Sequence, residues 1–435
     1  MLKIFSAIKK YVSARPIRFH MPGHKGGKFI KVQPKYDVTE LSTIDNGEVV
    51  KSAEIDVAKI LGAKWCKFLT DGASSGIFAL LYAVKDLGKK ILISRWSHKS
   101  VYNALKLFNI EPIILGGLDK DGLPVHITPK EVELNLSEDV IGAFITYPDY
   151  YGRTCDIKGI TKVLKDNHKL LLVDNAHGNH YNFSDLTYVG EYADAWVDGV
   201  HKTNYTFNQG AVVCVNNSSL IDLVFDGTDV FSTTSPSYII LSSIEYGIKY
   251  SEVKGRKKFL ALNDRVKNIK AKIINLGLKV VESDDFIKLT VDFGGVGYDV
   301  KEAEKILEQN KIYAELIDER RVLFMFSANT KNRELTKLVR TIKKITNTLN
   351  KGQTVVGKSI GGGIKKVDYL SAISAKWQLV DLNDAVGKIS AQNFGIFPPC
   401  FPVVVAGEEI TKECVEFLKD KELFGLTQGK VKVLI

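Results

Sequence analysis

The segment "IKGITKVLKDNHKLLLVD", residues 157–174, predicts a helix that is followed at once by a buried strand. Residues 157–167 carry apolar side chains three and four positions apart, which is the spacing of an amphipathic helix. Residues 169–174 form a short apolar run that ends in Asp174, as expected of a strand covered on both faces. A helix between two such strands favours a parallel arrangement, because parallel strands need a long crossover connection.

The same alternation continues on both sides of this segment. Short apolar runs separated by polar turns and helical stretches occur at residues 64–70, 89–94, 111–115, 140–146, 193–199 and 210–215. We therefore expect an α/β fold, with a mostly parallel sheet covered by helices on both faces and a smaller α+β region toward the C-terminus.

The chain is too long for a single core, because 435 residues exceed the length at which domains stop growing. We expect an N-terminal arm at residues 1–44, a large domain at 45–255, a small α+β domain at 256–350, and a linker with a C-terminal domain at 351–435. Within this last region the pattern of "LNDAVGKISA" predicts a helix over residues 382–391.

Composition narrows the class of protein. Apolar residues make up 45% and charged residues 25%, and no apolar run is long enough to cross a membrane. The net charge of +10 comes from scattered lysines, which indicates a solvated surface rather than a nucleic-acid site. The five cysteines form no CxxC pair, so we expect neither disulfides nor a metal site, and a reducing, cytoplasmic setting.

Candidate ligand-binding residues follow the expected strands, because open α/β sheets bind ligands at the carboxyl ends of their strands. In "LTDGASSGIF", residues 69–78, small residues stand where a strand gives way to a helix. Backbone N–H groups at a helix start, with the hydroxyls of Ser74 and Ser75, suit a phosphate. An ordinary helix-capping turn explains the same residues equally well.

Two charged residues lie at the same expected edge. Asp174 ends one buried strand, where it would neutralise a cationic nitrogen of a ligand; a turn cap is the alternative. Lys202 follows the next strand, and burial there would lower the pKa of its amine, as a lysine that binds a cofactor covalently requires. Of the four His-Lys pairs in the chain, His201-Lys202 has the best position, and His98 follows a third strand.

These residue types together fit one cofactor, pyridoxal phosphate: small residues for the phosphate, an aspartate for the ring nitrogen, an imidazole on the ring and a lysine for the aldehyde carbon. The chain also resembles the ornithine/lysine/arginine decarboxylases of fold type I from residue 18 to about residue 415. Eight segments carry the resemblance in order: "FHMPGHKGG", "DGASSG", "SHKSV", "YPDYYG", "VDNAHGNH", "VHKT", "TTSPSY" and "FPPCFPVVVAGEEIT".

The resemblance implies a role for each candidate residue. Lys202 would bind the cofactor, Asp174 would pair with the ring nitrogen and His98 would stack on the ring. The phosphate would be held by the loop of Ala73, Ser74 and Ser75 together with His201, while Ala176 and His177 would line the ring's other side. Thr234 and Ser235 would reach the phosphate from a neighbouring subunit, which implies a homodimer or tetramer with a shared active site. We expect a short form without the N-terminal wing domain.

The implied activity is decarboxylation of a basic amino acid (arginine, lysine or ornithine) to an amine of the polyamine pathway. Alternatives are an aminotransferase or another lyase on the same fold, or a non-catalytic homologue. The last is motivated by lost hydroxyls, which would weaken the phosphate site: Gly199-Val200 replaces the Ser-Thr usual in the family, and Asp71-Gly72-Ala73 replaces its usual Asn-Gly-Ser/Thr. Asp45, Glu48 and Glu315 are candidates for binding the distal cation of the substrate, although each could equally be a surface charge.

Overall fold

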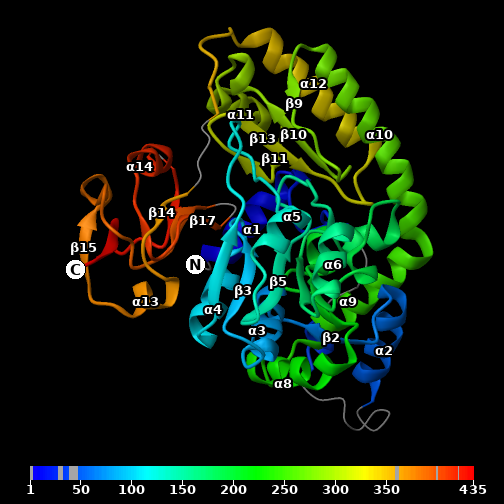
Figure 1. Ribbon diagram of the computed structural model, residues 1–435. Coiled ribbons are helices and arrows are strands. Elements are labelled where there is room, and N and C mark those ends of the chain that lie inside the picture. Colours follow the sequence, from blue (N-terminus) through cyan, green and yellow to red (C-terminus); the bar gives the residue numbers. More distant parts are fainter. Residues whose placement is uncertain (1–2, 28–32, 39–47, 358–361, 398–399, 420) are drawn as a thin grey trace.

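The computed structural model describes residues 3–27, 33–38, 48–357, 362–397, 400–419 and 421–435. Figure 1 shows a large unit around one sheet, a second unit with α10, α11 and α12 above it, and a C-terminal unit beside it. The expected boundaries at residues 255 and 350 stay predictions, and the boundary at residue 44 lies outside the described residues. None of the described helices combines the length and the apolar composition needed to cross a membrane.

A seven-stranded sheet forms the centre of the large unit, in the order β2-β8-β7-β6-β5-β3-β4. Strands β4, β3, β5, β6 and β7 run parallel to their neighbours, and only β8 runs antiparallel, between β7 and β2. The expected α/β fold with a mostly parallel sheet is therefore confirmed. The strands are β2 (Trp65–Leu69), β3 (Lys90–Ser94), β4 (Glu111–Leu115), β5 (Val140–Thr146), β6 (Leu170–Asn175), β7 (Ala195–Asp198) and β8 (Ala211–Val215).

Helices cover both faces of this sheet because side chains alternate along each strand. In β3, Leu92 packs into one hydrophobic core, whereas Ile91 and Ile93 pack into the other. The first core includes α2 (Val49–Leu61), α5 (Pro129–Leu134), α6 (Ile157–Asp166) and α9 (Tyr238–Tyr250). The second includes α3 (Ala73–Val84), α4 (Lys99–Phe108), α8 (Ile221–Phe231) and α13 (Tyr369–Ser374).

A long helical connection leads into the second unit. Helix α9 continues through a π-helical turn, η6 (Ser251–Gly255), into α10 (Arg256–Asn275). A four-stranded antiparallel sheet follows in the order β12-β13-β10-β9. Its elements are β9 (Lys279–Val280), β10 (Lys288–Asp292), β12 (Leu316–Ile317) and β13 (Arg321–Met325), with α11 (Val300–Gln309) and α12 (Asn332–Thr348).

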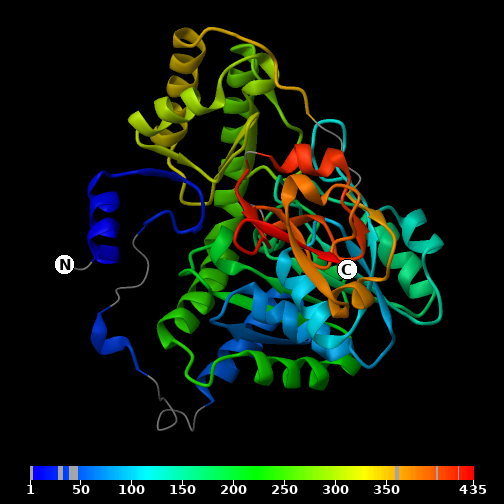
Figure 2. The ribbon, with the colours of Figure 1, turned by 90° about the vertical axis from the view of Figure 1, so that its left-hand side faces the viewer.

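The N-terminal arm joins this second unit. After α1 (Lys3–Ser13), strand β1 (Ile17–Phe19) pairs in parallel with β11 (Ile312–Ala314). Phe19 is buried there against Phe324 and Phe326, so the arm contributes to the core. Figure 2 shows the arm in dark blue, with α1 beside the body of the molecule.

The C-terminal unit consists of short elements: β14 (Ile364–Lys365), β15 (Trp377–Asp381), β16 (Phe394–Ile396), β17 (Phe401–Val404), β18 (Glu408–Glu409), α14 (Lys412–Leu418), β19 (Leu423–Phe424) and β20 (Lys430–Leu434). The predicted helix over residues 382–391 is wrong. Only Leu382–Ala385 forms a 3-10 turn, because Gly387 adopts a φ of +81° and Ser390 then bridges to Val433.

A buried ion pair connects the C-terminal unit to the sheet of the large unit. Arg95, just after β3, donates from Nη2 to Oε1 of Glu408 at 2.6 Å and from Nη1 to Oε2 at 3.2 Å. Both side chains are less than a tenth exposed, and Glu408 also accepts the backbone N–H groups of Val405 and Gly363. Removing one partner would leave the other charge buried and uncompensated.

We expect Arg95→Met to lower the free energy of unfolding by about 3–5 kcal/mol, because Glu408 would stay buried without its cation. Urea titration followed by tryptophan fluorescence measures the change. Lys162→Met is the matched control, since its partner Asp166 is 2.5 Å away but both side chains are more than half exposed, and such pairs contribute little. Equal unfolding midpoints for the two variants would contradict the role of the buried pair.

Candidate active site

The loops after several strands meet at one edge of the large sheet. Strands β3, β5, β6 and β7 are parallel, and β2 has the same direction because it and β7 both run antiparallel to β8. Their carboxyl ends therefore lie at the same edge, where open α/β sheets bind ligands. The loops and helix starts there carry the sequence-predicted residues His98, Asp174, Ala176, His177, His201, Lys202, Ala73, Ser74 and Ser75.

Lys202 lies in α7 (Val200–Thr203), a single turn directly after β7. Its Nζ is 3.2 Å from Nε2 of His177. Burial lowers the pKa of the Lys202 amine, and the carboxylates of Asp174 and Glu315 partly oppose this shift. A lysine whose amine is more easily deprotonated is a better nucleophile toward an aldehyde.

Asp174 is buried at the end of β6, with 4% of its surface exposed. Its Oδ1 accepts the backbone N–H of Ala176 at 3.1 Å. Burial raises the pKa of the Asp174 carboxyl, whereas the nearby Lys202 lowers it. The sheet edge thus holds a carboxylate and an amine of opposite charge away from water, and each makes the charge on the other less costly.

His98 caps α4 at its first turn. Its Nδ1 accepts the backbone N–H of Ser100 at 3.3 Å and lies 2.7 Å from the Ser100 hydroxyl, so the neutral ring carries its proton on Nε2. Burial first, and then the positive charges of Lys202 and Lys99, lower the pKa of His98 to about 4. The ring is therefore neutral at physiological pH, which suits stacking on an aromatic ligand.

His177 and His201 complete the group of imidazoles. Burial and the charge of Lys202 hold the pKa of His177 well below its usual value, and its buried Nδ1 has no partner among the described residues. The ring of His177 lies edge-on to that of Tyr150, at 5.1 Å between centroids. Nδ1 of His201 is 3.1 Å from the carbonyl oxygen of Gly210, and burial lowers the pKa of His201 to about 4.

The start of α3 is joined to the Lys202 turn through one loop. Gly72, at the cap position, has a φ of +81° and donates its backbone N–H to the carbonyl of Gln209 at 2.9 Å. The next carbonyl, that of Gly210, accepts the backbone N–H of His201 at 3.0 Å. No side chain caps α3, Ser74 is exposed, and the hydroxyl of Ser75 donates to the carbonyl of Gly72 at 3.0 Å.

Thr234 and Ser235 are exposed in the segment before α9. The backbone N–H of the adjacent Thr233 donates to Oδ2 of Asp71 at 3.3 Å, so this segment lies beside the start of α3 in the same chain. Contribution of Thr234 and Ser235 to the site of a neighbouring subunit stays a prediction.

Gly199 has no room for the hydroxyl-bearing residue usual at its position. A Cβ there would lie 2.5 Å from the carbonyl oxygen of Ala176 and 3.2 Å from Cδ of Lys202. The φ of Gly199 is −86°, so the reason is close packing against the Ala176 backbone and not a left-handed conformation. The missing side chain lets the loops after β6 and β7 approach each other.

Four residues near the site were missed or undervalued by sequence reasoning. Lys288 of β10 is buried, donates to the carbonyl of Asp149 at 2.9 Å, and has a pKa lowered to about 8 by burial. The hydroxyl of Tyr150 donates to Oε1 of Glu315 at 2.7 Å. Asp198, the last residue of β7, is fully buried. Asp198 had an overlooked signal, a carboxylate that ends a buried strand, whereas Glu315 was among the candidates and Tyr150 lies in the segment "YPDYYG". Lys288 had no signal in the sequence.

Glu315, Glu48 and Asp45 have different surroundings. Glu315 accepts the backbone N–H of Met21 at 2.7 Å and influences the pKa of Lys202, so it lies between the arm and the site. Glu48 is exposed and pairs with Lys51 at 3.3 Å. Asp45 lies outside the described residues.

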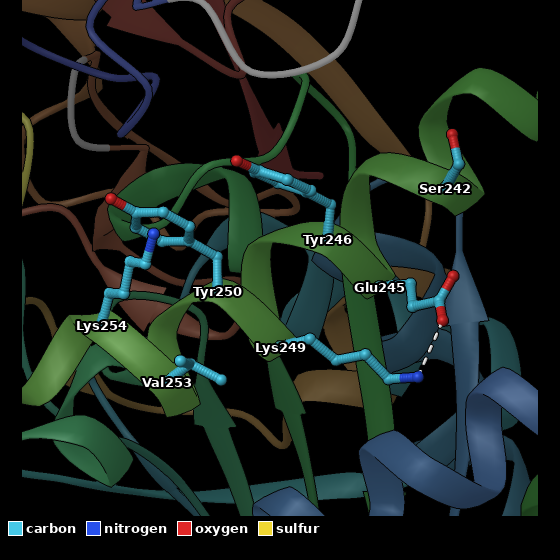
Figure 3. Close-up of a pocket in the computed structure, with 7 residues that line it drawn as sticks. All are labelled: Ser242, Glu245, Tyr246, Lys249, Tyr250, Val253 and Lys254. Carbon is cyan, nitrogen blue, oxygen red and sulfur yellow. Dashed lines mark hydrogen bonds and ion pairs between the residues drawn. The ribbon is translucent and has the colours of Figure 1, made fainter.

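A separate open groove of about 560 Å³ runs along α9 and η6. Figure 3 shows Tyr246 and Tyr250 projecting from one side of these turns, and the ion pair of Glu245 with Lys249. The groove is lined by Ser242, Glu245, Tyr246, Lys249, Tyr250, Val253 and Lys254. No sequence-predicted site residue is among them, so this groove is distinct from the candidate active site.

The residues at the sheet edge fit pyridoxal phosphate. Lys202 supplies a buried amine, Asp174 a buried carboxylate, and His177 a buried ring nitrogen that no described residue binds. The start of α3, a helix of twelve residues without a capping side chain, offers free backbone N–H groups to a phosphate. These features place the chain among the pyridoxal-phosphate enzymes of fold type I.

Comparison with known proteins gives the family. Residues 3–292 match "Orn/Lys/Arg decarboxylase, major domain", and residues 366–426 match the "C-terminal domain" of the same family. The chain therefore belongs to the ornithine/lysine/arginine decarboxylase family. It is 27% identical to an arginine decarboxylase of Bacillus subtilis over 95% of this chain and 92% of that protein. It is 26% identical to an arginine decarboxylase of Bacillus anthracis over 97% of this chain and 93% of that protein.

Solved structures share the fold. The constitutive lysine decarboxylase of Escherichia coli superposes with a TM-score of 0.75 at 17% identity, covering 100% of this chain and 82% of that one. Lysine decarboxylase A of Pseudomonas aeruginosa gives a TM-score of 0.76 at 14% identity, covering 99% and 82%. The predicted family, fold class, cofactor and reaction class, a pyridoxal-phosphate-dependent decarboxylase of basic amino acids, are confirmed.

The buried imidazoles predict loss of stability in acid. Because the pKa of His201 is about 4 in the folded chain and 6.5 ordinarily, the unfolded chain binds more protons between these values. The contribution of His201 to the stability of the folded chain is therefore complete above pH 6.5 and is lost as the pH falls through 4. Asp198, whose pKa burial raises to about 6, has the opposite effect.

A variant comparison isolates the histidine contribution. We expect the urea midpoint of the cofactor-free protein to fall less between pH 7 and pH 4.5 in His201→Gln than in the unsubstituted chain, because glutamine takes up no proton. His168→Gln, at an exposed position, should keep the unsubstituted difference. The same pH dependence in all three proteins would refute the assignment.

Proposed function

We propose that this protein decarboxylates L-arginine to agmatine and CO₂, taking up one proton. The observation that carries the proposal is the buried Lys202 amine beside Asp174 and His177. The support for arginine as the substrate is that four relatives matching more than nine tenths of this chain are arginine decarboxylases. We further propose a cytoplasmic homodimer or tetramer in which Thr234 and Ser235 serve the neighbouring site.

Bound pyridoxal phosphate would supply an electron-withdrawing ring that accepts the electrons left behind by CO₂. Asp174 would hold a proton on the ring nitrogen, because a buried carboxylate stabilises a nearby cation. His98 would stack on the ring in its neutral form, and the N–H groups at the start of α3 would bind the phosphate with His201. Lys202 would hold the cofactor through its amine and would return a proton to the substrate Cα when CO₂ has left.

Glu315 is the proposed partner of the distal guanidinium. Its carboxylate already accepts from Tyr150 and Met21, but a carboxylate has about four acceptor positions, so two remain for a bidentate cation. Its influence on the pKa values of Lys202, Lys288 and Lys25 shows that several positive groups surround it. A substrate cation would find there a half-buried negative charge.

Borohydride reduction of the cofactor-loaded protein should attach the pyridoxyl group to Lys202, as peptide mapping would show.

Asp174→Asn should keep the cofactor bound, yet lower CO₂ release from arginine at least about 100-fold, because an amide does not keep the ring nitrogen protonated. Labelling at Lys25 or Lys99, or near-normal turnover in Asp174→Asn, would overturn the assignment. A keto acid without CO₂ would instead indicate an aminotransferase.

Glu315→Gln should raise KM for arginine by about tenfold to 100-fold, since a hydrogen bond to a charged group contributes about 1.5–3 kcal/mol. The cofactor should still attach to Lys202, because Glu315 lies between the arm and the site and is not placed against the cofactor. Glu48→Gln, which alters an exposed carboxylate, is the control and should keep the original KM. An unaltered KM in Glu315→Gln would exclude Glu315 from substrate binding.

A further inference from the structure

The turn that carries Lys202 is too short to hold its own shape. Helix α7 spans only Val200–Thr203, and its cap residue Gly199 has no side chain to bind the free N–H groups. Isolated helical segments of this length are unstable, because the first turn fixes several dihedral angles for a single hydrogen bond. Contacts from other parts of the chain must therefore fix the backbone of Lys202.

One side chain, that of Asn179, joins the two ends of α7. Its Nδ2 donates to Oδ2 of Asp198 at 2.9 Å, and its Oδ1 accepts a hydrogen bond from Nδ2 of Asn204. Asp198 immediately precedes Gly199, and Asn204 immediately follows Thr203. Asn179, Asp198 and Asn204 are each at most 1% exposed, so water does not compete for these bonds.

The same carboxylate also reaches the strand of Asp174. Asp198 accepts a hydrogen bond from Nδ2 of Asn175, the neighbour of Asp174, and one from the hydroxyl of Tyr188 at 2.6 Å. The Tyr188 hydroxyl in turn accepts from Nε1 of Trp196 at 3.0 Å. Asp198 therefore ties the ends of β6 and β7 together, and with them the backbones of Asp174 and Lys202.

We propose that Asn179 is a positioning residue that, through Asp198 and Asn204, sets the place of the Lys202 amine relative to Asp174. This inference rests on the proposed covalent role of Lys202. Because a buried polar group without its partner is costly, loss of the amide would free both ends of α7 at once. The amine would then spend less time where the cofactor aldehyde meets it.

The test compares Asn179→Leu with Asn182→Leu. Asn182 lies in the same 3-10 turn, η3 (Asn179–Phe183), but its side chain donates to the carbonyl of Ile60 at 2.9 Å, and among the described residues no hydrogen bond joins it to Asp198 or Asn204. Leucine has the branching and the number of heavy side-chain atoms of asparagine but larger methyl groups, so both variants lose the amide hydrogen bonds and add the same volume. Asn182 is only partly buried, so Asn182→Leu reports the general cost of placing leucine in this turn and losing one amide hydrogen bond there.

The first measurement is hydrogen exchange of the peptide around residues 198–206 in the cofactor-free protein. Exchange should be about tenfold faster in Asn179→Leu than in Asn182→Leu, as the loss of one or two buried hydrogen bonds predicts. Equal exchange in the two variants would overturn the proposal. This measurement needs no bound cofactor, so it stays decisive even if Lys202 carries none.

The second measurement is the rate of covalent cofactor attachment, followed by absorbance and by borohydride trapping on Lys202. Attachment should slow by about tenfold in Asn179→Leu, which loses the bonds to both ends of α7, and by less in Asn204→Leu, which loses only one of them. The double variant should be no slower than Asn179→Leu, because that change already removes the bond to Asn204. Additive losses, or a rate equal to that of Asn182→Leu, would contradict the proposal. If Asn179→Leu does not fold, Asn204→Leu takes its place: attachment slower than in Asn182→Leu supports the proposal, and an equal rate overturns it.

Discussion

The burial of Lys202 and Asp174 at one edge of the sheet is the constraint on which the rest of the site depends. Each charge would be costly away from water by itself, but each lowers the cost of the other. The imidazoles around them stay neutral for the same reason, since burial and the charge of Lys202 both disfavour a second cation. Because the three imidazoles are neutral and Asp174 balances Lys202, these four basic side chains can lie close together without charge repulsion.

This electrostatic arrangement needs a rigid support, which comes from β6 and β7. Their parallel pairing places the backbones of Asp174 and Lys202 on neighbouring strand ends. Gly199 lets these ends approach closely, because any side chain there would collide with the Ala176 carbonyl. The loss of a hydroxyl at this position, which by sequence suggested a weakened phosphate site, is thus coupled to a close packing of the two loops.

The second unit and the arm close the site from the other side. Lys288 comes from β10, Glu315 follows β11, and the backbone of Gly23 donates to the carbonyl of His201 at 2.8 Å. These residues are far apart in the chain, yet each approaches the loop of Tyr150 or the turn of Lys202. The side of the site that holds Glu315 and Lys288 is therefore built by contacts between units, while the side that holds Lys202 and Asp174 belongs to the large sheet.

The sequence by itself determined the alternation of strands and helices, the strand ends at which Asp174, His98 and Lys202 lie, and the family. These features are local, because the hydrophobic periodicity and the end of a strand can each be recognised from a few consecutive residues. The false helix at residues 382–391 shows the limit of such patterns, since Gly387 and a bridge to a distant strand prevailed there. Only the tertiary structure brought Glu315, Lys288 and Asn179 to the site, because no local pattern records contacts across such sequence separations. Glu315 and Lys288 bind the loop of Tyr150, and Asn179 binds the residues that flank the Lys202 turn.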